Sequence, residues 1–471
     1  DDGAGTVNQA GGTASATSLI LANDIGTGIY NLSGGSLSTS DTTINAGTFT
    51  QSGGTHTVTN NLTATGFYNL DNGILDVSGT LSGSGFIYNG GTLIATAVDG
   101  GTFHVDGNVA ESLSIGTISN AVVNVSNSQA LNLSVIDSGQ FNVFGGGSLV
   151  ANSANGGGFN VIGASTLNVT DLTISDSLSV SADSTLEFST LTQVGGSIST
   201  PLTVGASDTY TYTGGTFDAS LVNNGQVNLN ANFTASGGIV NDGIIDVTTS
   251  QFAIDGTGLD NNATINMAGA ILTGAGPLVN DGTINGTGGN LQITGGGGFT
   301  NNGTLTMNSG QLTIGGSITN AGVINAAFQN DMIVDSALSN SGTVNLNGGN
   351  MSGAAALTNT ATGTLNGNGA VTVDIVNDGI VNAQSGNLVL AGSNFNNSGL
   401  VKNSVGSNLF VNSAAVSHTG SIEVNSAGSV VFSGAVSNTV GETVQMNGGA
   451  LSTGGLTNDS GGIISGFGSL T

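Results

Sequence analysis

Leu338-Ser-Asn-Ser-Gly-Thr-Val-Asn345 and Phe299-Thr-Asn-Asn-Gly-Thr-Leu-Thr306 carry the pattern that decides the fold. In both stretches an apolar residue stands two positions before an asparagine, and another stands four positions after it. The pattern returns about every twentieth residue, and a short period held this long predicts stacked structural units rather than one globular core. The asparagine column so defined consists of Asn223, Asn241, Asn261, Asn280, Asn301, Asn320, Asn340, Asn359, Asn377, Asn397, Asn438 and Asn458, with His418 at the position between Asn397 and Asn438.

Each repeat alternates apolar and small polar residues, as in Val344, Leu346 and, after a Gly-Gly pair, Met351. Alternation with a period of two predicts short β-strands, and no stretch shows the apolar spacing of a helix. Ordering one unit of about 19 residues costs roughly 20–40 kcal/mol. Burying its five or so apolar side chains returns only about 8–15 kcal/mol. We therefore expect an all-β, single elongated parallel β-helix (β-solenoid) of about two dozen coils of about 19 residues, each stabilised by its neighbours.

The first half carries a related, less regular motif. Tyr30-Asn-Leu-Ser-Gly-Gly-Ser-Leu37 matches Tyr68-Asn-Leu-Asp-Asn-Gly-Ile-Leu75 and Tyr210-Thr-Tyr-Thr-Gly-Gly-Thr-Phe217, and Phe86 and Phe103 are expected to continue its aromatic column. The register slips between residues 178 and 210, which predicts an irregular coil or loop there. The sequence therefore predicts three segments: 1–29, a first coil or subunit-contact segment; 30–220, a less regular solenoid; and 221–471, a regular solenoid with the asparagine column.

Two properties of asparagine suit a repeated corner. Asn tolerates left-handed backbone conformations, and the Gly of Asn-Asp-Gly, as at 280–282, would supply a second turn residue. Its amide both donates and accepts, so stacked Asn side chains can bond one another as a ladder. We expect that ladder along the asparagine column; the alternative is a row of solvent-exposed turns without side-chain bonds.

Composition excludes whole classes of partner. Lys402 is the single Lys or Arg against 28 acidic residues, a formal net charge of −27, and the chain has no Cys. Without a basic surface, binding to nucleic acid or anionic lipid is not expected. No apolar run approaches the roughly 20 residues of a membrane helix, so insertion into a membrane is not expected either.

The repeats quoted above resemble the β-helical repeats of bacterial surface proteins, namely filamentous haemagglutinins and autotransporter passenger domains. The resemblance covers nearly the whole chain and is one of repeat pattern. It implies a right-handed parallel β-helix, an extracellular location at the bacterial cell surface, and adhesive or structural work. The secretion domain of the haemagglutinins and the membrane barrel of the autotransporters are not visible in this sequence.

Candidate catalytic and metal sites are few, and we predict no catalytic, cofactor or metal residues. The nearest carboxylate pairs, Asp242 with Asp246 and Asp255 with Asp260, would be needed for glycoside hydrolysis. Turn acids such as Asp242 could instead hold structural calcium, although the Gly-Gly-x-Gly-x-Asp calcium repeat does not recur.

The three histidines, His56, His104 and His418, are far apart in coil number. They are therefore expected at solvent-facing or turn positions rather than around a shared metal.

The leading hypothesis is a non-enzymatic extracellular structural protein, the building block of a cell-surface fibre or matrix, polymerised head to tail through open solenoid ends as a homo-oligomer or homopolymer. The repeat pattern runs to Gly466-Phe-Gly-Ser-Leu-Thr471. We therefore expect the ends to meet other subunits or further coils. The alternatives are an adhesin passenger that binds glycans or a host surface and, less favoured, a carbohydrate-active β-helix enzyme.

Overall fold

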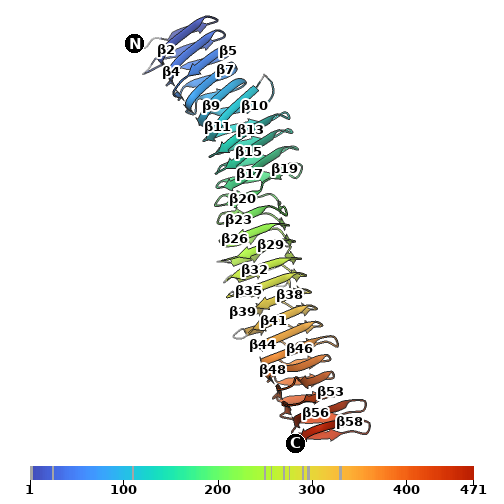
Figure 1. The fold of residues 1–471 in the computed structure, drawn as a ribbon. Helices are drawn as coiled ribbons and strands as arrows, with labels where there is room; N and C mark the ends of the chain where they lie inside the picture. Colours follow the sequence, from blue (N-terminus) through green and yellow to red (C-terminus); the bar gives the residue numbers. More distant parts are fainter. Residues whose placement is uncertain are drawn as a thin grey trace. The chain divides into compact units, whose positions relative to one another are not determined.

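The chain is a parallel β-solenoid of about 23 turns spaced roughly 19 residues apart, with 66% strand and no helix in its described part. The computed structural model describes residues 4–23, 26–108, 111–248, 251–255, 257–268, 271–274, 276–288, 291–293, 297–327 and 331–471. Figure 1 shows successive coils laid one on the next with their strands side by side. The coils belong to two compact units, Asp1–Thr200 with Asp208–Asp218, and Pro201–Ser207 with Ala219–Thr471. The solenoid predicted from the period is confirmed.

Coils of the second unit are built from three short strands, for example β28 (Ile239–Asn241), β29 (Ile244–Val247) and β30 (Gln251–Ile254). Each strand pairs in parallel with its equivalent one coil later, so that Asn241 lies beside Asn261. The strand that ends in the asparagine column forms a sheet of its own, made of β22 (Leu202–Val204), β25 (Leu221–Asn223), β28, β31 (Leu259–Asn261), β34 (Leu278–Asn280), β37 (Phe299–Asn301), β40 (Ile318–Asn320), β43 (Leu338–Asn340), β45 (Leu357–Asn359), β47 (Ile375–Asn377), β49 (Asn394–Asn397) and β52 (Ala415–His418).

The core follows from the alternation of each strand. In β37 the apolar Phe299 and the polar Asn301 both face inward, whereas Thr300 between them is partly exposed. The next strand, β38 (Thr304–Met307), buries Leu305 and Met307 in the same way. Because successive side chains of a strand point to opposite faces, each strand contributes two inward columns. One of these columns is polar, and it is the asparagine column.

Coils of the first unit contain aromatic stacks. Tyr30 of β3 (Gly28–Leu32) lies beside Phe49 of β5 (Thr48–Val58), which lies beside Tyr68 of β7 (Phe67–Ser82). Their rings stack with centroids 4.9 and 4.5 Å apart. These large side chains bury apolar area where the repeat lacks an inner asparagine.

The register in this unit departs from the sequence alignment in two places. Phe103 of β10 (Thr102–Val105) pairs with Tyr88 rather than with Phe86, a shift of two residues. Tyr210, which the motif aligns with Tyr30 and Tyr68, pairs instead with Leu191 and so lies in the column that Leu191 shares with Leu172. The stretch between residues 178 and 210, predicted to be irregular, contains short paired strands such as β20 (Thr190–Gln193), and the chain first passes from one unit to the other within it, after Thr200.

The backbone role predicted for the asparagines is wrong. Among the described residues, positive φ angles outside glycine occur at other positions, and no member of the asparagine column has one. Gly282 of the Asn-Asp-Gly stretch also has no positive φ; a Cβ there would lie 2.1 Å from the carbonyl oxygen of Ala263. The corner therefore uses Asn for its amide and Gly for the close approach of two coils.

Candidate functional site

The asparagine column forms a continuous buried ladder. The Nδ2 of Asn301 donates to the Oδ1 of Asn320, 2.7 Å away, and the Nδ2 of Asn320 donates to the Oδ1 of Asn340 at the same distance. Both side chains are fully buried. Rungs of the same kind join Asn223, Asn241, Asn261, Asn280, Asn301, Asn320, Asn340, Asn359, Asn377 and Asn397.

The amides of the ladder have one orientation. The Nδ2 of Asn301 also donates to the carbonyl oxygen of Val323, 3.1 Å away in the following coil. Nitrogen is thus fixed at the position that faces a carbonyl acceptor, and every rung donates toward the C-terminal coil. Hydrogen bonds to the neighbouring amides and carbonyl groups replace the bonds to water that each amide loses on burial. The ladder therefore holds polar groups inside the solenoid without leaving them unpaired.

The ladder ends at His418. The Nδ2 of Asn397 lies 2.8 Å from the Nδ1 of His418, which therefore takes the acceptor role of the missing amide. Within the described part of the chain, the His418 Nε2 and the Asn438 Oδ1 are buried without a hydrogen-bond partner. Burial lowers the pKa of His418 to about 4. A separate rung then joins Asn438 to Asn458, 2.6 Å apart.

A second buried polar cluster lies in the first unit around His56. The Tyr68 hydroxyl donates to the Gln51 Oε1 at 2.7 Å and lies 2.9 Å from the His56 Nδ1. The His56 Nε2 lies 3.2 Å from the Thr39 hydroxyl and 3.3 Å from that of Thr42. Since the tyrosine hydroxyl gives its proton to Gln51, it accepts from Nδ1–H, and the Nε2 is the acceptor. Burial lowers the pKa of His56 to about 3.

The solvent-facing position predicted for the histidines is therefore wrong for His56 and His418, which are buried, and correct for His104, which is exposed. Both buried rings stand in columns of inward-facing residues, where a neutral imidazole can donate and accept like an amide. The Tyr–Gln bond also recurs, since Tyr30 donates to Gln9 and Tyr210 to Gln193. Sequence reasoning missed these pairs; the available signal was a Gln about one coil before each Tyr.

An outward row of amides runs beside the inner ladder. Asn345 donates to Asn325 at 2.8 Å, and Asn382 donates to Asn366 at 2.7 Å. These bonds point toward the N-terminal coil, opposite to the inner ladder. We call this row the outer amide row; it comprises Asn266, Asn285, Thr306, Asn325, Asn345, Asn366 and Asn382.

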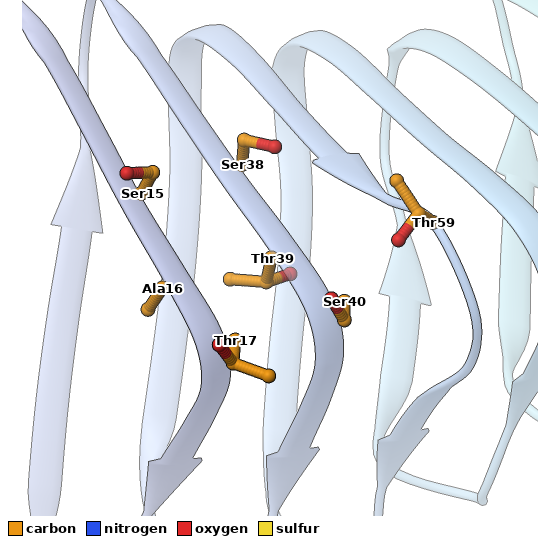
Figure 2. Close-up of a pocket in the computed structure, with 7 residues that line it drawn as sticks. All are labelled: Ser15, Ala16, Thr17, Ser38, Thr39, Ser40 and Thr59. Atoms are coloured by element: carbon orange, nitrogen blue, oxygen red, sulfur yellow. The ribbon is translucent and has the colours of Figure 1, made fainter.

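A shallow groove of about 350 Å³ lies along β2 (Thr13–Leu21) and β4 (Ser36–Ile44). Figure 2 shows its lining of small side chains, most of them with hydroxyl groups, from successive coils. Thr39 is nearly buried there and also bonds within the His56 cluster. The residues that line the groove include no charged group, so it offers hydrogen bonds but no acid or base.

The carboxylates of the candidate pairs and turns lie at the junctions between coils or on the exposed surface. Asp242 accepts from the Asn262 amide at 2.8 Å, and Asp246 accepts from the Asn266 amide at 2.8 Å. Asp281 and Asp378 accept in the same way from Asn302 and Ser398 of the next coil. Asp255 and Asp260, the other pair named above, are both exposed. Asp242, Asp246, Asp281 and Asp378 therefore bond neighbouring coils.

Among the residues that the structure describes, there is no group of three or more His, Cys, Asp or Glu side chains close enough together to hold a metal ion. The same part of the chain contains no helix of the length and apolar character needed to cross a bilayer. Comparison of the chain with protein-family models, with curated proteins and with solved structures finds no match. The geometry of the coils is therefore the basis for a functional proposal.

Proposed function

We propose that the protein is a non-enzymatic structural element of a bacterial cell-surface fibre or matrix, located outside the cell and assembled from copies of itself. The observation that carries this proposal is the inner ladder, in which nine consecutive Asn–Asn hydrogen bonds join neighbouring coils. Such a column adds rigidity and offers nothing to a substrate, because its amides are buried.

The acidic surface supports the same proposal. A net charge of −27 with one Lys or Arg keeps long assemblies from bundling side by side. Contact between molecules would then use apolar surface rather than opposite charges. In β58 (Ile463–Leu470), Phe467 and Leu470 are exposed, whereas the equivalent position of the preceding coil, Leu451, is fully buried.

Phe467 and Leu470 are apolar side chains of β58 that such a contact would cover. A following coil, whether of this chain or of another molecule, would cover Phe467 and Leu470 and pair the edge of β58. In the proposed fibre copies join by strand pairing, because a parallel solenoid can continue across a molecular boundary in that way.

Electron microscopy of the purified chain tests the proposal. Filaments with a regular subunit repeat are expected, and Phe467→Ser together with Leu470→Ser should reduce them to single particles because the apolar contact is lost. Val405→Ser is the matched control, since Val405 is similarly exposed at 70% but lies in a lateral turn. Single particles of the unaltered chain at high concentration would contradict the fibre.

A second candidate is an adhesin that binds glycans or a host surface. The observation in its favour is the outer amide row, which presents partly exposed amide groups at regular coil spacing on an outer face. Amides donate to and accept from sugar hydroxyls, and the row requires no charge to do so.

Binding to a glycan array tests this candidate. Asn345→Ala with Asn366→Ala removes two consecutive amides of the outer amide row and should abolish any glycan signal. Asn302→Ala, which removes an exposed amide outside the row, should leave the signal unchanged. If both variants bind alike, the row is not the binding face.

A further inference from the structure

The sheet that carries the asparagine column is interrupted between β52 and β55 (Ala435–Asn438). Its strands from β22 to β52 are joined without a gap, and β55 pairs only with β57 (Gly455–Asn458). Among the described residues of these two coils, no backbone hydrogen bond joins β52 to β55. The corner bond is missing as well: Thr419 N donates to Asn397 O and Asp459 N to Asn438 O, but no such bond joins Thr439 to His418.

The interruption is local to one face of the solenoid. The same two coils remain paired on the other faces, where Ile422 lies beside Val444 and Val430 beside Leu451. On the open face Val416 is half-buried, although its equivalents Phe395 and Val436 are fully buried. Solvent therefore reaches a position that other coils close.

Three buried polar atoms without partners belong to this pair of coils. They are the Ser413 Oγ, just before β52, the His418 Nε2 at the end of β52, and the Asn438 Oδ1 at the end of β55. Among the described residues only one other such atom occurs, the Oε2 of Glu111 in the first unit. A buried polar atom without a partner costs about 1–3 kcal/mol, so three around one gap call for a common explanation.

The ladder fixes what these atoms can bind. Asn397 donates to the Nδ1 of His418, so the neutral ring carries its proton on Nε2, which is a donor. A protonated Nε2 cannot ligate a metal ion, and the Asn438 Oδ1 is an acceptor. A molecule that both accepts from Nε2–H and donates to Oδ1 satisfies the two, and water does so while also bonding free backbone groups.

We propose that the gap between β52 and β55 is a built hydration site, in which an ordered water accepts from the His418 Nε2–H and donates to the Asn438 Oδ1. The water takes the place of the missing Asn–Asn bond. Donation still runs toward the C-terminal coil, from Asn397 to His418, from His418 to the water, and from the water to Asn438. The free backbone groups of β52 and β55 line the same site and bind further water. The site makes this face the one place in the described asparagine column where coils are joined through solvent.

A crystal structure of the whole chain at a resolution that shows ordered water tests the proposal directly. The expected result is a water within hydrogen-bond distance of both the His418 Nε2 and the Asn438 Oδ1. A direct contact between these two atoms, or a gap that is closed by strand pairing or left empty, overturns the proposal.

Hydrogen exchange followed by mass spectrometry gives an independent readout in solution. Backbone amides of β55 should exchange at least about 10-fold faster than those of β49, which pairs on both sides. His418→Asn supplies the missing amide and should slow exchange in β55 by about the same factor. His104→Asn, at an exposed position in the first unit, is the matched control and should change nothing there. Equal exchange in β49 and β55 of the unaltered chain overturns the proposal, and so does a folded His418→Asn variant with unchanged exchange.

Discussion

Asn301→Ala removes one complete rung of the inner ladder. In the folded chain the Asn301 amide accepts from Asn280 at 2.7 Å and donates to the Asn320 Oδ1 at 2.7 Å and to the Val323 carbonyl oxygen at 3.1 Å. After the substitution the Asn320 Oδ1 has lost its donor in a site that water does not reach, because Asn301 and Asn320 are both 0% exposed.

The cost follows from what is left unpaired. A buried acceptor without a donor costs about 1–3 kcal/mol, and the lost bond to the Val323 carbonyl adds roughly 1 kcal/mol, for a total of about 2–4 kcal/mol. Asn280 keeps its other bond, to the Thr304 carbonyl oxygen at 3.1 Å, and contributes little to the loss. Since 1.4 kcal/mol is a factor of ten, local opening should become roughly 30- to 700-fold more frequent.

Hydrogen exchange followed by mass spectrometry is the suitable assay. Global unfolding of a repeat protein is not two-state, so a denaturation midpoint would average over many coils. Exchange instead reports opening at each coil. The increase should appear in the peptides that contain β37 and β40 and should fade over the neighbouring coils.

Asn302→Ala is the control within the same coil. Asn302 is exposed, and its amide donates to the Asp281 carboxylate at 2.7 Å on the surface, where such bonds contribute about 0–1 kcal/mol. If exchange around β37 changes equally in the two variants, or in neither, the ladder does not stabilise the coils as argued. Asn301→Asp sharpens the test, because an isosteric carboxylate keeps the acceptor, loses both donors, and should cost more than alanine.

Three further predictions concern other contacts. Stability should fall as pH drops below about 6.5, because the unfolded chain then binds protons on His56 and His418 while the folded chain does not until about pH 3 and 4; circular dichroism at falling pH should show losses worth roughly 3–5 kcal/mol per ring, and a chain equally stable at pH 7 and 4 contradicts this. Gly322→Ala places a Cβ 2.0 Å from a carbonyl of the preceding coil and should speed hydrogen exchange in β41 (Val323–Ala327), whereas Gly455→Ala, whose nearest neighbour is at 3.8 Å, should leave exchange in β57 unchanged. Tyr68→Phe leaves two buried polar groups without partners and should cost about 2–3 kcal/mol in local exchange, an expectation that unchanged protection would refute.

The sequence predicted the coils because their period is local information. Alternation around residues such as Val344 and Leu346 indicates a strand, and the spacing of Asn301, Asn320 and Asn340 indicates one coil. Since a coil cannot bury its apolar face alone, stacking followed from energetics, and an amide in every coil then implied a ladder. Those predictions are confirmed by the parallel pairing and by the rungs themselves.

Other features required the tertiary structure. Asn301 and Asn302 are the same residue type at adjacent positions, yet one is a buried rung and the other a surface amide. The two-residue shift that places Phe103 beside Tyr88 is likewise invisible in the motif.

His418 shows most clearly what the sequence by itself determined about this protein and what only the tertiary structure decided. The spacing placed it in the asparagine column, and that position is confirmed by its pairing with Asn397. The unpaired Nε2 and the open face beside it appear only once coils are stacked. The physical reason is that a period along one chain fixes which residues face inward, whereas the fit of an imidazole between two amide rungs depends on atoms about 20 residues away in both directions.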